Sequence, residues 1–377
     1  MVSRPIPALL VSAALAAALG GAAFLPGPAV AGDSGKPIVI ALEAPLTGDQ
    51  SSNGQDMLRG AQLAAMQVNT RGGVLGRQIS IVGVDDQADP ALARQAVRES
   101  VAAGAVAVIG PYNSSVGLKN LGLYEDERIV PMRMTSDNRT EGYGATLQPM
   151  NSQISPVEVD FISGQGYRSV VMLVDPSAYT KSIAERTANG LEKAGVAVTR
   201  IMIPPSASDY SAEVSQALAL NPDLVYSATY YPEGVIIAAE LAAANSGAQC
   251  FMNLANVDRA FVQEAGLEVS QECIFSGVPA AAQLPDAGRY VAAYRKAFGV
   301  QPDVWGAFTY DSAWVLFRAM EAVGSTRYGA VLDAVLHTRG MQGATGTIDI
   351  RSKTGNRAHA PVYILAVDDA GDFVIVQ

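Results

Sequence analysis

The chain has 377 residues, of which 49% are hydrophobic and 16% charged, and its 26 basic and 36 acidic side chains give a net charge of -10. This length exceeds what one hydrophobic core usually organises, so we expect a globular protein with two lobes. The acidic balance argues against nucleic acid and anionic membranes as partners, because both are bound through Lys and Arg.

Residues 1–31 have the pattern of a secretion signal. Arg4 supplies a basic start, the stretch from Ala8 to Leu25 is rich in Ala, Leu and Val, and Ala29-Val30-Ala31 matches an A-x-A cleavage site. A retained membrane anchor is the alternative, and the prolines and small residues that end the apolar stretch disfavour it. We therefore expect an exported mature chain that begins at residue 32.

Continuous apolar runs in the first part of the chain predict buried parallel strands rather than half-exposed ones. We expect these strands at residues 37–42, 79–84, 105–109 and 129–134. A helix over 54–69 is predicted by one apolar stripe, made of Met57, Ala61, Ala64, Ala65 and Val68.

A second helix should follow the strand at 79–84. Asp89 is its expected N-cap, Pro90 lies in its expected first turn, and Gly104 closes it.

A second series of strands and helices begins at about residue 152. Strands are expected near residues 170, 196, 224, 250 and 273, with helices near 182–194, 210–220, 234–245 and 258–265. An amphipathic segment at 288–298 and a helix at 308–323 follow, and residues 362–367 and 373–376 read as a terminal hairpin.

This order predicts an α/β fold with two doubly wound parallel-sheet lobes. Lobe 1 is expected to comprise residues 32–152 plus 279–355, and lobe 2 residues 153–278 plus 356–377. Several crossings between the lobes would form a hinge that closes on a ligand.

Four apolar runs end in polar or aromatic clusters, at the strand edge where such sheets bind ligands. The clusters span residues 110–115, 175–179, 230–233 and 255–258. Ser114 begins a helix whose free N–H groups favour an anion such as a carboxylate, although it could instead only cap that helix. Tyr179, Tyr230 and Tyr231 could cover an apolar part of a ligand or simply pack at the surface.

Signals for catalysis and metal binding are weak. His337 and His359 are the only histidines, and neither has further ligands at metal spacing. The acidic cluster of Asp85, Asp86 and Asp89 is better explained as a helix start than as a cation site. Without a cofactor loop or a nucleophile motif, we expect no enzyme activity, no cofactor and no metal.

The two cysteines, Cys250 and Cys273, begin neighbouring predicted strands. Strands in one sheet lie close enough for a disulfide, and an exported chain meets an oxidising compartment. A disulfide and a pair of reduced, buried thiols both remain open.

Several short segments together resemble the periplasmic leucine/isoleucine/valine-binding proteins, the substrate-binding subunits of branched-chain amino acid ABC transporters. The matching segments are Pro45-Leu46-Thr47-Gly48, Asn69-Thr70-Arg71-Gly72-Gly73, Asp85-Asp86-Gln87-Ala88-Asp89-Pro90, Val108-Ile109-Gly110, Tyr124-Glu125-Asp126-Glu127 and Tyr230-Tyr231-Pro232-Glu233. The resemblance covers nearly the whole mature chain. It implies a type I periplasmic binding protein with a three-crossing hinge, an interlobe ligand cleft and a periplasmic location, and we expect a monomer.

The resemblance also implies roles for individual residues. Ser114 matches the serine that contacts the ligand carboxylate, and Tyr179 and Tyr230 match tyrosines of the pocket. Thr135 or Ser136 stands where the family uses a threonine on the carboxylate. The other predicted ligand-binding residues are Tyr112, Asn113, Ser115, Asn256 and Asn53.

One departure from the family bears on the ligand. The acidic residue that binds the α-ammonium falls at about Ala255 here, with Asn256 or Asp258 as substitutes. Burying an ammonium without a partner costs several kcal/mol, so ligands with and without a free amine both stay open. Arg133, if it points into the cleft, would instead pair with an acid group.

We therefore expect a secreted solute-binding protein of an ABC importer, which captures a small amino acid or a related carboxylate or amide and delivers it to a membrane permease. The alternative is a ligand-sensing module that reports to a chemoreceptor or signalling partner through the same cleft.

Overall fold

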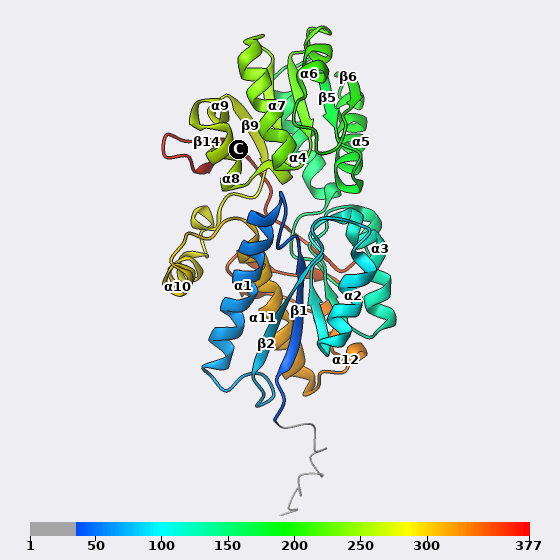
Figure 1. Ribbon diagram of the computed structural model, residues 1–377, viewed down its shortest axis with the longest axis vertical. Helices are drawn as coiled ribbons and strands as arrows, with labels where there is room; N and C mark the ends of the chain where they lie inside the picture. The colour runs from blue at the N-terminus through cyan, green and yellow to red at the C-terminus, as the bar shows by residue number, and fades with distance from the viewer. Residues whose placement is uncertain (1–34) are drawn as a thin grey trace, which may run out of the picture. The chain divides into compact units, whose positions relative to one another are not determined.

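The computed structural model describes residues 35–377, so the predicted signal segment lies outside the described residues. Within residues 35–377, helices long and apolar enough to cross a membrane are absent. The described chain contains two large sheets, each covered by helices (Figure 1), and two short two-stranded sheets.

The first sheet has the strand order β2-β1-β3-β4, and all its neighbours are parallel. Its strands are β1 (Ile38–Ala44), β2 (Ile79–Asp85), β3 (Ala105–Ile109) and β4 (Val130–Met132). All four strands were predicted from the sequence. The last strand is shorter than predicted because Arg133 leaves the sheet and donates its backbone N–H to Ala145.

Both faces of the first sheet are buried, which is what its continuous apolar strands predict. Ile40 and Leu42 pack with α1, whereas the intervening Ala41 packs with α2 and α3. The helices around this sheet are α1 (Ser51–Asn69), α2 (Ala93–Ala102), α3 (Ser114–Asp126), α11 (Trp305–Val323) and α12 (Tyr328–Leu336).

Two helix starts differ from the prediction. Helix α1 begins at Ser51, three residues early, because the polar run Ser-Ser-Asn resembles a loop but lies in the first helical turn. The predicted N-cap role of Asp89 is wrong, since α2 begins at Ala93. Asp89 instead accepts the backbone N–H of Ala91 in the turn that precedes this helix.

The second sheet has the order β15-β14-β9-β8-β7-β5-β6. Its strands are β5 (Ser169–Val174), β6 (Ala197–Met202), β7 (Leu224–Ala228), β8 (Gln249–Met252), β9 (Cys273–Gly277), β14 (Tyr363–Val367) and β15 (Phe373–Ile375). Strands β5 to β9 are parallel, and the predicted terminal hairpin β14–β15 joins their edge in the antiparallel sense.

Six helices accompany the second sheet: α4 (Asn151–Gly164), α5 (Ala178–Lys193), α6 (Ser211–Leu218), α7 (Tyr231–Ala244), α8 (Arg259–Ala265) and α9 (Leu267–Gln271). The predicted lobe 1 and lobe 2 ranges contain the strands of the first and second sheets, respectively.

The chain passes between the two sheets three times. It leaves the first sheet after β4, leaves the second after β9, and returns to the second with β14. The segment between the last two passes contains α10 (Gly288–Phe298), α11, α12 and the short paired strands β10 (Met341–Gly343), β11 (Gly346–Ile348), β12 (Ile350–Arg351) and β13 (Asn356–Arg357).

Helices α1 and α11 approach closely beside the first sheet (Figure 1). A Cβ atom added at Gly60 would lie 2.0 Å from the carbonyl oxygen of Gly306, so glycine is needed where the two backbones meet.

Cys250 and Cys273 are paired in register on β8 and β9, and a disulfide joins them with a Cα–Cα distance of 4.5 Å.

Candidate functional site

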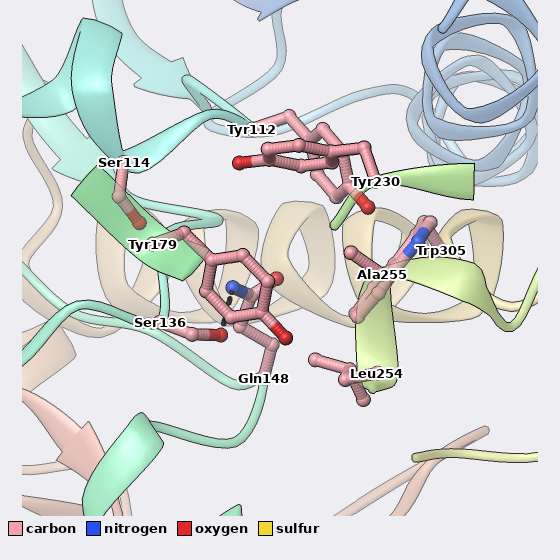
Figure 2. Close-up of a pocket in the computed structure, with 9 residues that line it drawn as sticks. All are labelled: Tyr112, Ser114, Ser136, Gln148, Tyr179, Tyr230, Leu254, Ala255 and Trp305. Carbon is pink, nitrogen blue, oxygen red and sulfur yellow. Dashed lines mark hydrogen bonds between the residues drawn. The ribbon is translucent and has the colours of Figure 1, made fainter. Parts of the chain in front are cut away.

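A small cavity lies where loops from both sheets meet. Its lining residues are Tyr112, Ser114, Ser136, Gln148, Tyr179, Tyr230, Leu254, Ala255 and Trp305 (Figure 2). The continuous free space admits little more than a water molecule. A larger ligand therefore requires the lining side chains to move apart.

The carboxyl ends of strands position most of these side chains. Tyr112 and Ser114 follow β3, and Tyr230 lies between β7 and α7. Tyr179 stands in the first turn of α5, directly after the loop from β5. Leu254 and Ala255 belong to the short 3-10 helix η2 (Leu254–Asn256) that follows β8. The cavity thus occupies the strand edge at which parallel α/β sheets bind ligands.

Four aromatic rings form a connected wall around the cavity. The ring centroids are 5.5 Å apart for Trp305 and Tyr112, 6.2 Å for Tyr112 and Tyr230, and 5.7 Å for Tyr230 and Tyr179. Each ring is tilted by 51° to 62° against the next. Figure 2 shows Tyr112 and Tyr230 above the cavity, Tyr179 on one side and Trp305 on the other. Burial raises the pKa of the three tyrosines, so their hydroxyls stay protonated.

The polar groups of the cavity are neutral hydroxyls and one carboxamide. Gln148 donates through Nε2 to Ser136 Oγ at 2.9 Å, and Ser114 Oγ accepts the backbone N–H of Asp137 at 3.3 Å. In the described part of the chain, Gln148 Oε1 and the Tyr179 hydroxyl are buried without a hydrogen-bond partner.

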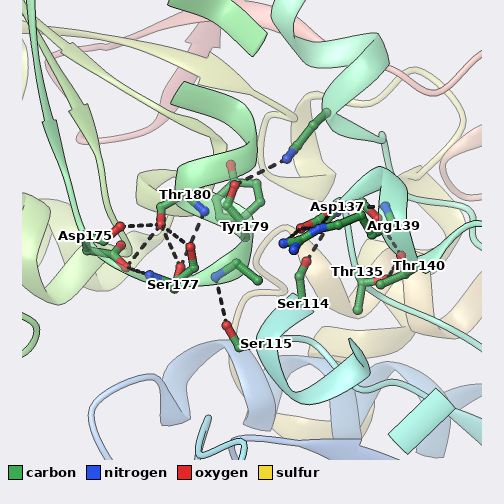
Figure 3. Close-up of polar contacts among 12 residues, drawn as sticks. Ser114, Ser115, Thr135, Asp137, Arg139, Thr140, Asp175, Ser177, Tyr179 and Thr180 are labelled. Atoms are coloured by element: carbon green, nitrogen blue, oxygen red, sulfur yellow. Dashed lines mark hydrogen bonds and ion pairs between the residues drawn. The ribbon is translucent and has the colours of Figure 1, made fainter. Parts of the chain in front are cut away.

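Five of the ten residues that the sequence predicted for ligand binding come together here. They are Tyr112, Ser114, Ser136, Tyr179 and Tyr230. Of Thr135 and Ser136, only Ser136 lines the cavity, and the Thr135 hydroxyl is hydrogen-bonded to Thr140 Oγ1 at 2.7 Å (Figure 3).

Besides Thr135, four further predicted residues have side chains outside the cavity lining. Ser115 Oγ accepts the backbone N–H of Ala178 at 2.9 Å, across from the first turn of α5 (Figure 3). Asn113 donates to Gln50 Oε1 at 2.9 Å. Asn53 is buried within the first turn of α1.

The side chain of Asn256 is hydrogen-bonded to neighbouring loop residues. Its Nδ2 donates to Asn253 Oδ1 at 2.7 Å and to the carbonyl oxygen of Thr229 at 3.1 Å. It therefore fixes the loops after β7 and β8 instead of lining the cavity.

No Lys, Arg, Asp or Glu of residues 35–377 lines this cavity. Arg133 does not point into it, because its buried guanidinium donates to the carbonyl oxygens of Tyr143, Gly144 and Thr354 and to Asn356. Ala255 does line it, and this is the position at which the resemblance places the acidic residue of the family.

Asp258 does not replace the missing carboxylate. Its Oδ1 accepts the backbone N–H of Ala260 at 2.7 Å and caps α8, while its Oδ2 accepts Ser52 Oγ at 2.7 Å. Burial raises the pKa of this carboxyl to about 6.

The lining includes residues that the sequence did not single out, namely Gln148, Leu254 and Trp305. Gln148 lies in the irregular stretch that crosses between the sheets, where no periodic pattern marks a side chain. Trp305 is the first residue of α11 and lies three residues before the predicted start of that helix. The only sequence feature that could have pointed to it is a tryptophan close to a helix end.

Further hydrogen bonds connect the two sets of elements around the cavity. Ser52 of α1 bonds Asp258, as described, and the Tyr231 hydroxyl donates to the carbonyl oxygen of Asp49 at 2.5 Å. Within residues 35–377, groups of three or more His, Cys, Asp or Glu placed to hold a metal ion are absent.

The chain is similar to known binding proteins along most of its length. It is 26% identical over 304 residues to the Leu/Ile/Val-binding protein homolog 2 of Brucella abortus, covering 79% of this chain and 81% of the relative. It is 25% identical over 324 residues to the leucine-, isoleucine-, valine-, threonine- and alanine-binding protein of Pseudomonas aeruginosa, covering 84% and 86%.

Solved structures show the same fold. The leucine binding protein LivK of Thermotoga maritima superposes with a TM-score of 0.83 at 22% identity, covering 90% of this chain and 98% of that one. A solute binding protein of an ABC transporter from R. palustris, in complex with benzoate, gives 0.81 at 19% identity, covering 90% and 96%. The predicted type I fold is confirmed.

These similarities confirm the resemblance to Leu/Ile/Val-binding proteins that the sequence motifs indicated. Because the family and these relatives are binding proteins, they also support the prediction that the chain is not an enzyme. The model of the family described as periplasmic binding protein matches residues 37–372, and the chain belongs to this family.

Proposed function

We propose that this protein is exported to the periplasm and serves there as the solute-binding subunit of an ABC importer. It captures a small amino acid, or a related carboxylate or amide, and delivers it to a membrane permease. The observation that carries the proposal is the cavity itself, whose walls come from strand-end loops of both sheets. The lobe boundaries near residues 152, 279 and 356 belong to the same proposal, because a ligand held between two lobes couples binding to their closure.

The cavity wall fits a small ligand that has an apolar part. Tyr112, Tyr230 and Trp305 offer ring faces, and Leu254 adds an aliphatic surface. Ser114 lies at the N-terminus of α3, where unpaired N–H groups and the helix dipole favour a ligand oxygen. The relatives point to the same size class, since one is named for five amino acids and one neighbouring structure holds benzoate.

A thermal-shift screen of amino acids, small amides and aromatic acids tests the proposal. A ligand present at 100 times its Kd stabilises the native state by about 2.7 kcal/mol, which a melting curve resolves. A screen in which every compound leaves the melting temperature unchanged would contradict the proposed function. Loss of ligand uptake by cells that lack the protein tests delivery to a permease.

Two substitutions test the site assignment. Tyr230→Ala removes a central ring of the wall, and Ser114→Ala removes a hydroxyl at the start of α3. Each should weaken binding of the best ligand by tenfold or more. Tyr143→Ala is the control, because this tyrosine is exposed and lies outside the cavity lining. Unchanged affinity in both cavity variants would remove the assignment.

A further inference from the structure

The orientation of the Gln148 carboxamide in the cavity is determined by hydrogen bonds to its neighbours. Ser136 donates its only hydroxyl proton to the carbonyl oxygen of Pro149 at 2.7 Å. Gln148 Nε2 lies 2.9 Å from the same serine oxygen and must therefore donate to it. This bond determines which end of the carboxamide faces Ser136, as the dashed line in Figure 2 shows. Gln148 Oε1 is left on the other side as a pure acceptor, without a partner among the described residues.

Two hydroxyl protons complement this acceptor. The Tyr179 hydroxyl donates its proton to no acceptor within residues 35–377, although the residue is only 4% exposed. Ser114 Oγ accepts from the backbone N–H of Asp137, which leaves its proton available to donate. The cavity therefore offers two hydroxyl donors and one fixed carbonyl acceptor.

The carboxylates around the cavity lie outside its lining and are held by other groups. Asp175, whose charge acts on Tyr230, accepts the backbone N–H of Ser177 and the hydroxyl of Thr180. Glu158, whose charge acts on Tyr179, accepts hydroxyl protons from Tyr226, Ser276 and Thr187 at 2.5 to 3.0 Å. Asp258 is held by Ser52 and by its own helix. A buried ammonium would thus lack a counter-charge, and a carboxylate would place an oxygen against Gln148 Oε1.

We propose that Gln148 is the specificity-determining residue of this cavity, and that it reads an N–H donor of an uncharged carboxamide head group on the ligand. The carbonyl oxygen of that amide accepts from the hydroxyls, and the aromatic wall covers the apolar remainder. Ser136 is a positioning residue, since it acts through the orientation of Gln148. This inference rests on the proposed function and narrows its ligand class to amides.

Three nearly isosteric probes separate head-group charge from shape. Benzamide is neutral, benzoate is an anion and benzamidine is a cation at pH 7.5. Isothermal titration of each into the purified protein should show benzamide binding at least tenfold more tightly than the other two. An unsatisfied or repelled buried group accounts for a difference of this size.

Variants then assign the selectivity to Gln148. Gln148→Leu should weaken benzamide binding by tenfold or more, and Gln148→Glu should reverse the ranking in favour of benzamidine. Ser136→Ala frees the carboxamide to turn and should narrow the preference for benzamide over benzoate. Gln342→Leu is the matched control, because this exposed glutamine bonds only Thr347, outside the cavity.

The outcomes distinguish this inference from the proposed function. Benzoate or benzamidine binding as tightly as benzamide overturns the inference, as does Gln148→Leu with unchanged benzamide affinity. If leucine or another compound of the screen binds while benzamide does not, the amide assignment fails and the proposed function stands. If no compound binds, the proposed function fails. Melting curves check that each variant folds. If Gln148→Leu does not fold, the probe rankings of Gln148→Glu and Ser136→Ala test the inference instead.

Discussion

Ser52→Ala is expected to weaken ligand binding from outside the cavity. Ser52 lies in the first turn of α1, beside the first sheet, and donates to Asp258 Oδ2 at 2.7 Å. Asp258 follows β8 of the second sheet and is 1% exposed. Neither residue lines the cavity, so this bond affects a ligand only by holding the two sets of elements together.

The expected size of the effect follows from burial. The substitution leaves one oxygen of a buried carboxylate without its hydroxyl donor, which costs about 1–3 kcal/mol. The loss applies to the closed arrangement, because water replaces the hydroxyl once the lobes part. Ligand affinity should therefore fall by roughly fivefold to 150-fold. The N-cap of α8 stays intact, because Asp258 Oδ1 makes it separately.

Isothermal titration and a stopped-flow dissociation rate, with the best ligand of the thermal screen, measure this effect. Most of the change should appear as faster dissociation, since the bond forms only after the lobes meet. Ser163→Ala is the matched control, because the Ser163 hydroxyl bonds only the carbonyl oxygen of Val159 in its own helix. A Ser52→Ala variant that folds and keeps both the affinity and the dissociation rate of the parent refutes the reasoning.

Three predictions concern the stability of the fold. Burial raises the pKa of Glu158 to about 7 from 4.5, so its ionisation should cost about 3 kcal/mol of folding free energy as the pH rises from 4.5 through 7. Denaturant unfolding at pH 5 and pH 8 should show this loss in the parent and a flatter profile in Glu158→Gln; equal profiles would contradict it. The denatured, unreduced chain should show no free thiol, and reduction of the Cys250–Cys273 bond should lower stability by about 3 kcal/mol for its 23-residue separation; two reactive thiols before reduction would exclude the bond. Gly60→Ala should lower the melting temperature despite the better helix propensity of alanine, because the added Cβ meets a backbone oxygen. The control Gly329→Ala in α12 should be neutral or stabilising, because nothing lies within 4 Å of its added Cβ. Equal effects of the two substitutions would contradict the close-approach argument.

The parts of the site that the sequence predicted are those that local pattern determines. Ser114, Tyr179 and Tyr230 each follow a continuous apolar run, and the run places them at the carboxyl edge of a parallel strand. Three such residues from different strands must converge if the strands share an edge or face one another. The alternation of strands and helices gave the fold class in the same way.

The remaining part depends on contacts between distant segments. Gln148 reaches the cavity from a stretch without helical or strand periodicity, and Trp305 reaches it from a helix that lies 193 residues after Tyr112 in the numbering. Arg133 shows the converse, because an arginine close to the site in sequence turns to the backbone carbonyls of a neighbouring loop. A local sequence pattern cannot predict whether such a side chain points into the cavity or away from it, because the groups that it contacts come from distant segments.

The contrast between two buried polar clusters indicates where this fold leaves room for a ligand. Both oxygens of Glu158 are satisfied by hydroxyls from α5, β7 and β9, so this cluster is complete without a ligand. Gln148 Oε1 and the Tyr179 hydroxyl are as deeply buried, yet they lack partners in the described chain. An unsatisfied buried group costs about 1–3 kcal/mol, and a ligand that supplies the missing partner recovers that free energy on binding. The same two atoms that lower the stability of the protein alone should therefore contribute most to the selectivity of its cavity.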